Sequence, residues 1–160
     1  MAVPDVAVRC GHQQPRALSS WRGQRVRIVA GDADAAAPVR EDPRLVTVWL
    51  RPPAQEAQNA VLPTDADCVA EDPARAWSAF GLVAGTRQLA GTQLLADRDG
   101  WLRARSQPGQ AGWSEDNLVC RTDNAPRALQ PAAPPADGLG ALIALMDAER
   151  VRFVKGGFVH

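Results

Sequence analysis

Residues 91–119, GTQLLADRDGWLRARSQPGQAGWSEDNLV, contain two Gly-Trp pairs, Gly100-Trp101 and Gly112-Trp113, twelve residues apart. Glycine allows the backbone to turn where other residues would clash, and tryptophan supplies a large surface for burial. Short apolar runs lie before, between and after the two pairs. A repeat of this kind at hairpin spacing predicts a small, tightly wound antiparallel β unit.

The turn residues divide this region into short strands. Asp99-Gly100 and Pro108-Gly109 are typical of tight turns between antiparallel strands. Between them, Arg103 and Arg105 alternate with Leu102 and Ala104, so we expect both arginines on one face of a strand. The strands that we expect lie near residues 82–89, 92–97, 101–106, 110–114 and 117–120.

The order of these residues resembles a bacterial SH3-like (SH3b) domain, in which Gly-Thr opens one strand, Gly-Trp starts the next and Gly-x-x-Gly-Trp closes the hairpin. The matching residues are Gly91-Thr92, Leu94-Leu95, Gly100-Trp101-Leu102-Arg103, Gly109, Gly112-Trp113 and Leu118-Val119. The resemblance implies an SH3-like barrel near residues 78–122, and a protein that binds peptides or ligands or takes part in an assembly. The upstream stretch, residues 79–86, departs from the family pattern, so the first strand of the barrel would come from elsewhere.

The remaining sequence predicts elements on both sides of the barrel. Residues 25–29 alternate arginine with β-branched residues, and residues 45–50 form a largely apolar run that contains β-branched residues. We expect these two strands to form a hairpin joined by a long loop. A short helix is predicted over residues 71–80, with Asp72 as its N-cap and Pro73 at its first position. A second helix is predicted after Asp137, followed by a strand at residues 151–154 and a Gly-Gly turn.

These elements give a mainly β fold: an SH3-like small β-barrel with an N-terminal β-hairpin extension and a C-terminal helix. The expected division is an N-terminal extension and Pro-rich connector over residues 1–75, the barrel over 76–122, a linker over 123–136, and a helix and strand over 137–160. The Pro/Ala-rich composition of residues 51–75 and 121–136 marks the two connecting segments.

The composition excludes some classes of partner. The chain has 18 basic and 18 acidic residues, whereas domains that bind nucleic acid through phosphates usually have a basic excess. No apolar run approaches the roughly 20 residues that cross a bilayer, and the N-terminus lacks the pattern of a signal peptide. We therefore expect no nucleic acid, no membrane insertion, and a cytoplasmic or virion-associated location, or a periplasmic one if a leader has been removed.

The three cysteines, Cys10, Cys68 and Cys120, are widely spaced. Reduced, buried thiols are the first expectation from this spacing, and one bridge with a free thiol is the alternative. Residues 25–29 and 42–48 also resemble, more weakly, small bacterial serine-protease inhibitors of the potato-inhibitor type. That resemblance implies a Cys10–Cys68 bridge and a rigid exposed loop around residues 35–42.

The sequence shows no complete catalytic or metal site. A nucleophile needs a base oriented beside it, and the only histidines, His12 and His160, lie near the two termini. Cys10, His12, Cys68 and Cys120 lack the close pairs of structural zinc sites. Three Asp-x-Asp pairs lack the rest of a calcium loop. We therefore expect no enzyme activity, no metal and no cofactor.

The candidate binding residues are those that could face a partner, namely Trp101, Trp113, Arg103, Arg105 and Phe158. Either tryptophan fills the core or lines a shallow groove, and the arginines suit an anionic surface. The function that we expect is a non-enzymatic interaction or structural subunit of a bacterial or phage assembly, with another protein or copies of itself as partner. The alternatives are a module that binds a peptide or cell-wall fragment, and a serine-protease inhibitor.

Overall fold

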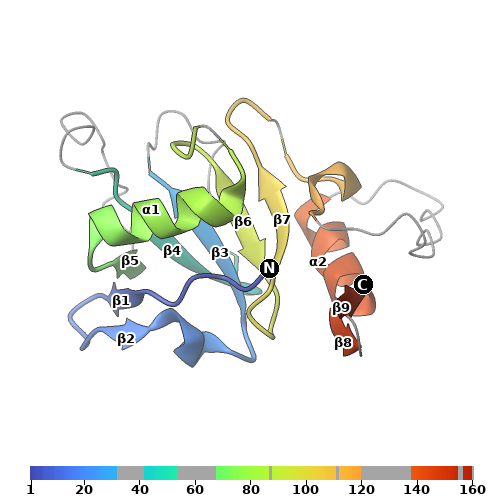
Figure 1. Cartoon of the computed structure of the whole chain (residues 1–160), viewed down its shortest axis with the longest axis horizontal. Helices are drawn as coiled ribbons and strands as arrows, with labels where there is room; N and C mark the ends of the chain where they lie inside the picture. Colours follow the sequence, from blue (N-terminus) through green and yellow to red (C-terminus); the bar gives the residue numbers. More distant parts are fainter. Residues whose placement is uncertain are drawn as a thin grey trace.

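The computed structural model of the protein describes residues 1–31, 42–53, 68–86, 88–110, 112–119, 138–154 and 157–159. For residues 152–154 and 157–159 it describes the backbone alone. Its centre is a seven-stranded sheet in the order β2-β1-β5-β4-β3-β6-β7 (Figure 1). The strand bounds are β1 Ala7–Cys10, β2 Arg16–Ala17, β3 Arg25–Ala30, β4 Leu45–Leu50, β5 Cys68–Ala70, β6 Gln93–Ala96 and β7 Leu102–Ser106.

The sheet is mixed and open, so the predicted SH3-like barrel is wrong. Strands β3, β4 and β5 run parallel to one another, while β1, β6 and β7 pair antiparallel to their neighbours. Strands β2 and β7 form the two edges. The resemblance to SH3b domains is thereby overturned, since β6 pairs along its other side with β3 instead of closing a small barrel. The sheet also draws strands from both sides of the expected boundary at residue 75.

Only the first Gly-Trp pair begins a strand. Gly100, with a φ of 84°, ends the turn between β6 and β7, so the predicted hairpin across residues 92–106 is present. Trp113 instead precedes a 3-10 helix, Glu115–Asn117, whose N-cap is Ser114. The expected strand at 110–114 is absent from its described residues, and at 117–120 only Leu118 bridges to Ala104.

Strands β3 and β4 are adjacent but parallel, so the predicted hairpin between them is wrong. Their register runs from Arg25 opposite Leu45 to Ala30 opposite Leu50. A parallel pair needs a crossover of about a dozen residues or more, and residues 31–44 are long enough to supply it. The alternating pattern of a strand gives its faces but does not give the direction of its neighbour.

Helix α1, Pro73–Ala84, begins where the sequence predicts and continues further. The Asp72 side chain accepts a hydrogen bond from the Arg75 backbone N–H at 3.1 Å, and Gly85 ends the helix with a φ of 58°. The expected strand at 82–89 is therefore wrong. Ala76, Phe80 and Ala84 are buried at intervals of four residues, so one stripe of α1 packs on the sheet.

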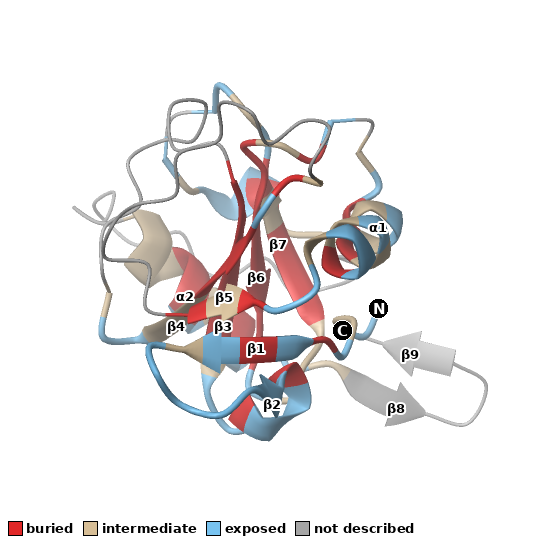
Figure 2. Ribbon diagram, turned by 90° about the vertical axis from the view of Figure 1, so that its left-hand side faces the viewer, coloured by how far each residue is buried: buried red, intermediate tan, exposed pale blue. Residues whose placement is uncertain are grey.

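Helix α2, Gly138–Ala148, covers the opposite face of the sheet from α1 (Figure 2). Leu142 and Met146 pack with Leu95 and Ala104 of the sheet, whereas α1 packs against Ile28, Leu50 and Leu94 among others. The predicted C-terminal helix is thus present, although its expected cap, Asp137, lies outside the described residues. A separate hairpin follows, formed by β8, Arg152–Val154, and β9, Gly157–Val159. No helix among the described residues is long and apolar enough to span a membrane.

Candidate functional site

Two cysteines far apart in the sequence meet between strands β1 and β5 of the sheet. Cys10 ends β1, Cys68 begins β5, and the two residues are direct partners in the antiparallel ladder. They form a disulfide with an S–S distance of 2.10 Å and a Cα–Cα distance of 4.0 Å, across a separation of 58 residues. The first expectation, three reduced thiols, is therefore wrong. Cys120 lies outside the described residues.

The two cysteine residues differ in their burial. Cys68 is buried, with 8% of its surface exposed, whereas Cys10 is half-buried. Beyond Cys10 the chain turns at Gly11, with a φ of 57°, and the Gln13 backbone N–H donates to the Cys10 carbonyl at 3.1 Å. Residues 11–17 are all exposed. Cys10 is therefore the less buried residue of the pair and lies next to an exposed segment.

Few ladder pairs hold the outer strands to the rest of the sheet. Strand β1 has three residue pairs with β5, and β5 has two with β4, while β3 and β4 share six. Other contacts support β1: Val8 is fully buried, Arg9 forms an ion pair with Glu71, and the Glu71 N–H donates to the Ala7 carbonyl at 2.9 Å. The disulfide is the covalent link in this otherwise short ladder.

A β-bulge separates the two arginines that were expected to share a face. The register of β6 and β7 shifts between Leu95 and Ala96, because Leu95 pairs with Ala104 while Ala96 pairs with Leu102. Arg103 is the extra residue. It points toward α2, whereas Arg105 donates a hydrogen bond to the carbonyl of Ala84 at the end of α1. The expectation of a common arginine face is therefore wrong.

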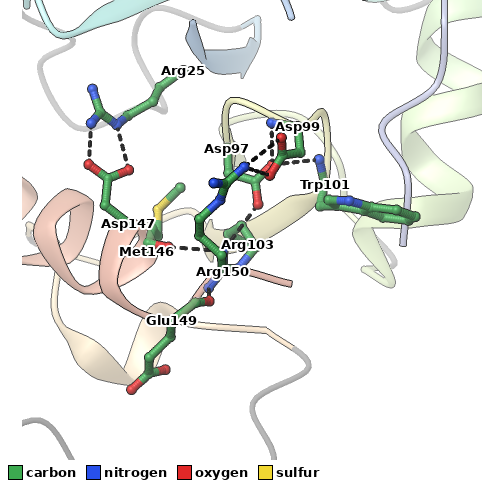
Figure 3. A network of polar contacts seen from close by, with 9 residues as sticks. All are labelled: Arg25, Asp97, Asp99, Trp101, Arg103, Met146, Asp147, Glu149 and Arg150. Carbon is green, nitrogen blue, oxygen red and sulfur yellow. Dashed lines mark hydrogen bonds and ion pairs between the residues drawn. The ribbon is translucent and has the colours of Figure 1, made fainter. Parts of the chain in front are cut away.

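Arg103 is a buried structural residue (Figure 3). Its guanidinium forms an ion pair with Asp97 at 3.1 Å and donates to the carbonyls of Met146 and Glu149 at the end of α2. Asp97 also accepts from the backbone N–H groups of Asp99 at 3.0 Å and Trp101 at 2.9 Å. The ion pair thus joins the β6–β7 turn to the C-terminal end of the helix, where a cation is favourable.

The other expected binding residues do not converge. Trp101 is half-buried, bridges to Ala2 and lies beside the β6–β7 turn, with its indole directed away from the Arg103–Asp97 pair (Figure 3). Trp113 packs on the cluster of Leu95, Ala104, Leu142 and Met146. Phe158 lies in β9, and its side chain is outside the described part. The structure shows no shared surface for these residues within the described part of the chain.

A second buried arginine, Arg27, lies on β3. Arg27 is 3% exposed and donates to Thr47 Oγ1 from Nε at 3.1 Å and from Nη2 at 2.8 Å. Burial lowers the pKa of Arg27, and the charge of Asp42 acts in the opposite direction. At the surface, the Asp42 pKa is lowered to about 2, mainly because its carboxylate accepts a hydrogen bond from Arg44.

The described residues contain no group of three or more His, Cys, Asp or Glu side chains that could hold a metal ion. The sequence also contains no C-x-x-C pair, since its cysteines are at positions 10, 68 and 120. The chemistry that the cysteine geometry offers is therefore exchange at a single disulfide between two strands, and not at a dithiol at the start of a helix.

Comparison with known proteins leaves the family open. No family model matches the sequence, and no curated protein matches it. Among solved structures, the chain is similar to the pneumococcal exposed lipoprotein thioredoxin (Etrx1) from Streptococcus pneumoniae strain TIGR4, with 18% identity and a TM-score of 0.44. The similarity covers 68% of this chain and 91% of that one. A likeness at this level does not assign a function to the chain.

The functions expected from the sequence are corrected together with the barrel. The assembly subunit and the peptide or cell-wall-fragment module both depended on an SH3-like barrel, and the sheet is open. The serine-protease inhibitor depended on a rigid loop whose residues 35–41 lie outside the described part. The Cys10–Cys68 bond that this resemblance implied exists, but it joins two neighbouring strands of a seven-stranded sheet.

Proposed function

We propose that this chain has a disulfide-based redox function, in which the Cys10–Cys68 bond is reversibly reduced and acts as a switch on the outer strands. The supporting observation is the position of the bond. It joins β1 and β5 where the ladder is short, and its Cys10 end is half-buried next to an exposed turn. A bond in this place is open to exchange and holds a part of the sheet that can loosen.

The reaction needs a dithiol as reductant. A thiolate of that dithiol attacks Cys10 Sγ, a mixed disulfide forms, and the Cys68 thiolate leaves. The second thiolate of the dithiol then attacks the first sulfur of the same dithiol, which is bonded to Cys10, and Cys10 leaves as a thiolate. Two electrons pass to the chain, the dithiol becomes a disulfide, and the two cysteine thiolates take up protons from solvent.

A switch fits the cysteine geometry better than a turnover catalyst. Catalytic dithiols commonly occur as C-x-x-C with one thiolate stabilised at a helix N-terminus, and this chain has no such motif. Here the cysteines are 58 residues apart and lie on two strands. The oxidised form is the stapled state, so we propose an oxidising compartment in which disulfides persist and a partner dithiol provides the signal.

The test is trapping of the mixed disulfide in the native protein. In a Cys120→Ser background, the folded chain is incubated with reduced glutathione, quenched with acid and mapped by mass spectrometry. We expect glutathione on Cys10 and a free thiol at Cys68, because Cys68 is the more buried residue. A triple variant lacking all three cysteines is the control for nonspecific adducts. A bond that reacts only after denaturant unfolds the protein would overturn the proposal.

A further inference from the structure

A groove of about 830 Å³ lies away from the disulfide, at the junction of four segments. Its walls come from Ala2 near the N-terminus, from the residues after the first 3-10 helix, Leu18–Trp21, from the β6–β7 turn and from the C-terminal end of α2. Small-molecule sites typically have volumes of roughly 300–1,000 Å³. The groove is therefore large enough for an organic molecule and not only for an ion.

Two arginines from distant parts of the sequence meet at this groove. The backbone N–H of Gly23 donates to the carbonyl of Arg98 at 2.8 Å, which holds the segment that carries Arg22 against the β6–β7 turn. Both arginines line the groove and both are exposed. Within the described residues, neither guanidinium has a hydrogen bond, an ion pair or an aromatic ring as partner.

The acidic groups of the groove are already engaged. Of the three carboxylates in its wall, Asp97 pairs with Arg103, Asp99 pairs with Arg150 at 2.9 Å, and Asp147 pairs with Arg25. Asp99 also raises the pKa of Arg150 through its hydrogen bond and its charge. No carboxylate of the wall is thus left for the two remaining arginines.

The local charge follows from these pairs. The wall holds three arginines and three aspartates, which cancel. Two of the aspartates have partners outside the wall, Arg25 and Arg103, which add two positive charges. The residues of the wall and these two partners together carry a net formal charge of +2, in a chain whose overall formal charge is zero.

We propose that this groove binds a small organic molecule through an oxyanion group, a phosphate monoester or a carboxylate, held by Arg22 and Arg98. Guanidinium groups form paired, charge-assisted hydrogen bonds with both kinds of oxyanion. The Asp97–Arg103 pair and the Asp99–Arg150 pair fix the turn that carries Arg98, so the site is built on a braced element. The proposal is independent of the disulfide and of its redox function.

Three probes with one carbon skeleton test the site: glycerol 3-phosphate, glycerate and glycerol. Each is titrated into the full oxidised chain while the amide resonances of Gly23, Arg98 and Gly100 are followed by NMR. We expect saturable shifts with an anionic probe and none with glycerol. Stronger binding of glycerol 3-phosphate assigns a phosphate ligand, and stronger binding of glycerate assigns a carboxylate. Shifts from neither anion, or equal shifts from glycerol, would overturn the proposal.

Matched charge variants complete the test. The double variant Arg22→Gln, Arg98→Gln should weaken binding by roughly tenfold or more, since it removes the charge-assisted donors. Arg75→Gln is the control, because Arg75 is exposed on α1 and does not line the groove. Thermal unfolding checks that all variants fold. Equal loss of binding in the control would show general charge attraction and would contradict a specific site.

Discussion

Removal of the Cys10–Cys68 bond should lower the free energy of unfolding by about 4 kcal/mol. A disulfide stabilises a protein mainly by restricting the unfolded chain, and the effect grows with the logarithm of the loop length. For the separation of 58 residues, the chain-entropy relation gives about 14 cal/mol/K, which corresponds to about 4 kcal/mol at 25 °C. In a domain of this size, that loss corresponds to a fall in Tm of roughly 8–16 °C.

The assay is urea unfolding at 25 °C, followed by the fluorescence of the five tryptophans. Three samples are compared: the oxidised Cys120→Ser protein, the same protein after reduction by a phosphine, and a variant in which Cys10 and Cys68 are also replaced by serine. Thiol counts of zero before reduction and two after it confirm the starting states. Free energies that agree within about 1 kcal/mol in all three samples would refute the expected loop-closure effect.

Three substitutions test the packing and charge of the fold. Arg103→Met should lower the free energy of unfolding by about 3 kcal/mol or more in urea titrations, because it leaves a buried carboxylate without its partner. Gly138→Ala should destabilise the chain, since the added Cβ would clash with a neighbouring carbonyl. The matched change Gly81→Ala has open space and should stabilise the chain by about 0.5–1 kcal/mol. Thermal melts in which both variants shift Tm in the same direction would contradict this pair of predictions. In the folded protein the Asp42 pKa is lowered from the ordinary aspartate value of 3.8 to about 2 by its hydrogen bond with Arg44. The carboxylate therefore stabilises the fold above pH 3.8, and this contribution is lost as the pH falls through 2. Asp42→Asn should therefore make the decline in unfolding midpoint between pH 4 and pH 2 shallower, and an unchanged decline would count against this role.

Local chemistry could be predicted from the sequence where one residue decides it. Asp72 and Pro73 fix the start of α1. Asp99-Gly100 gave the turn between β6 and β7. In each case the backbone conformation depends on neighbours in the sequence, so the signal lies within a few residues.

Pairing between distant segments could not be predicted. The alternating pattern of residues 25–29 does not distinguish a parallel from an antiparallel neighbour, and the apolar run at 82–84 suits a strand as well as the helix that it continues. The bulge at Arg103 shifts the register by one residue, which moves every later side chain of β7 to the other face. For that reason two arginines that alternate in the sequence point to opposite faces of the sheet.

The disulfide shows the same limit at the candidate site. Three isolated cysteines allow three pairings, and no local signal selects among them. Cys10 and Cys68 become partners because β1 aligns with β5 in one register, which follows from the whole sheet. The segments that carry the two exposed arginines of the groove are likewise held together by a hydrogen bond from the Gly23 N–H to the Arg98 carbonyl, which the sequence gives no reason to expect.

Amide hydrogen exchange of the oxidised and reduced forms, read by mass spectrometry in the Cys120→Ser background, tests the redox switch most directly. The switch predicts that reduction speeds exchange in β1, β2 and β5 and leaves β3, β6 and β7 protected, because the ladders of β1, β2 and β5 have two or three residue pairs each, whereas those of β3, β6 and β7 have four to six. Identical exchange in both forms would show that the bond controls nothing, and uniform loss of protection would show that it is only a structural staple. Either result would contradict the account.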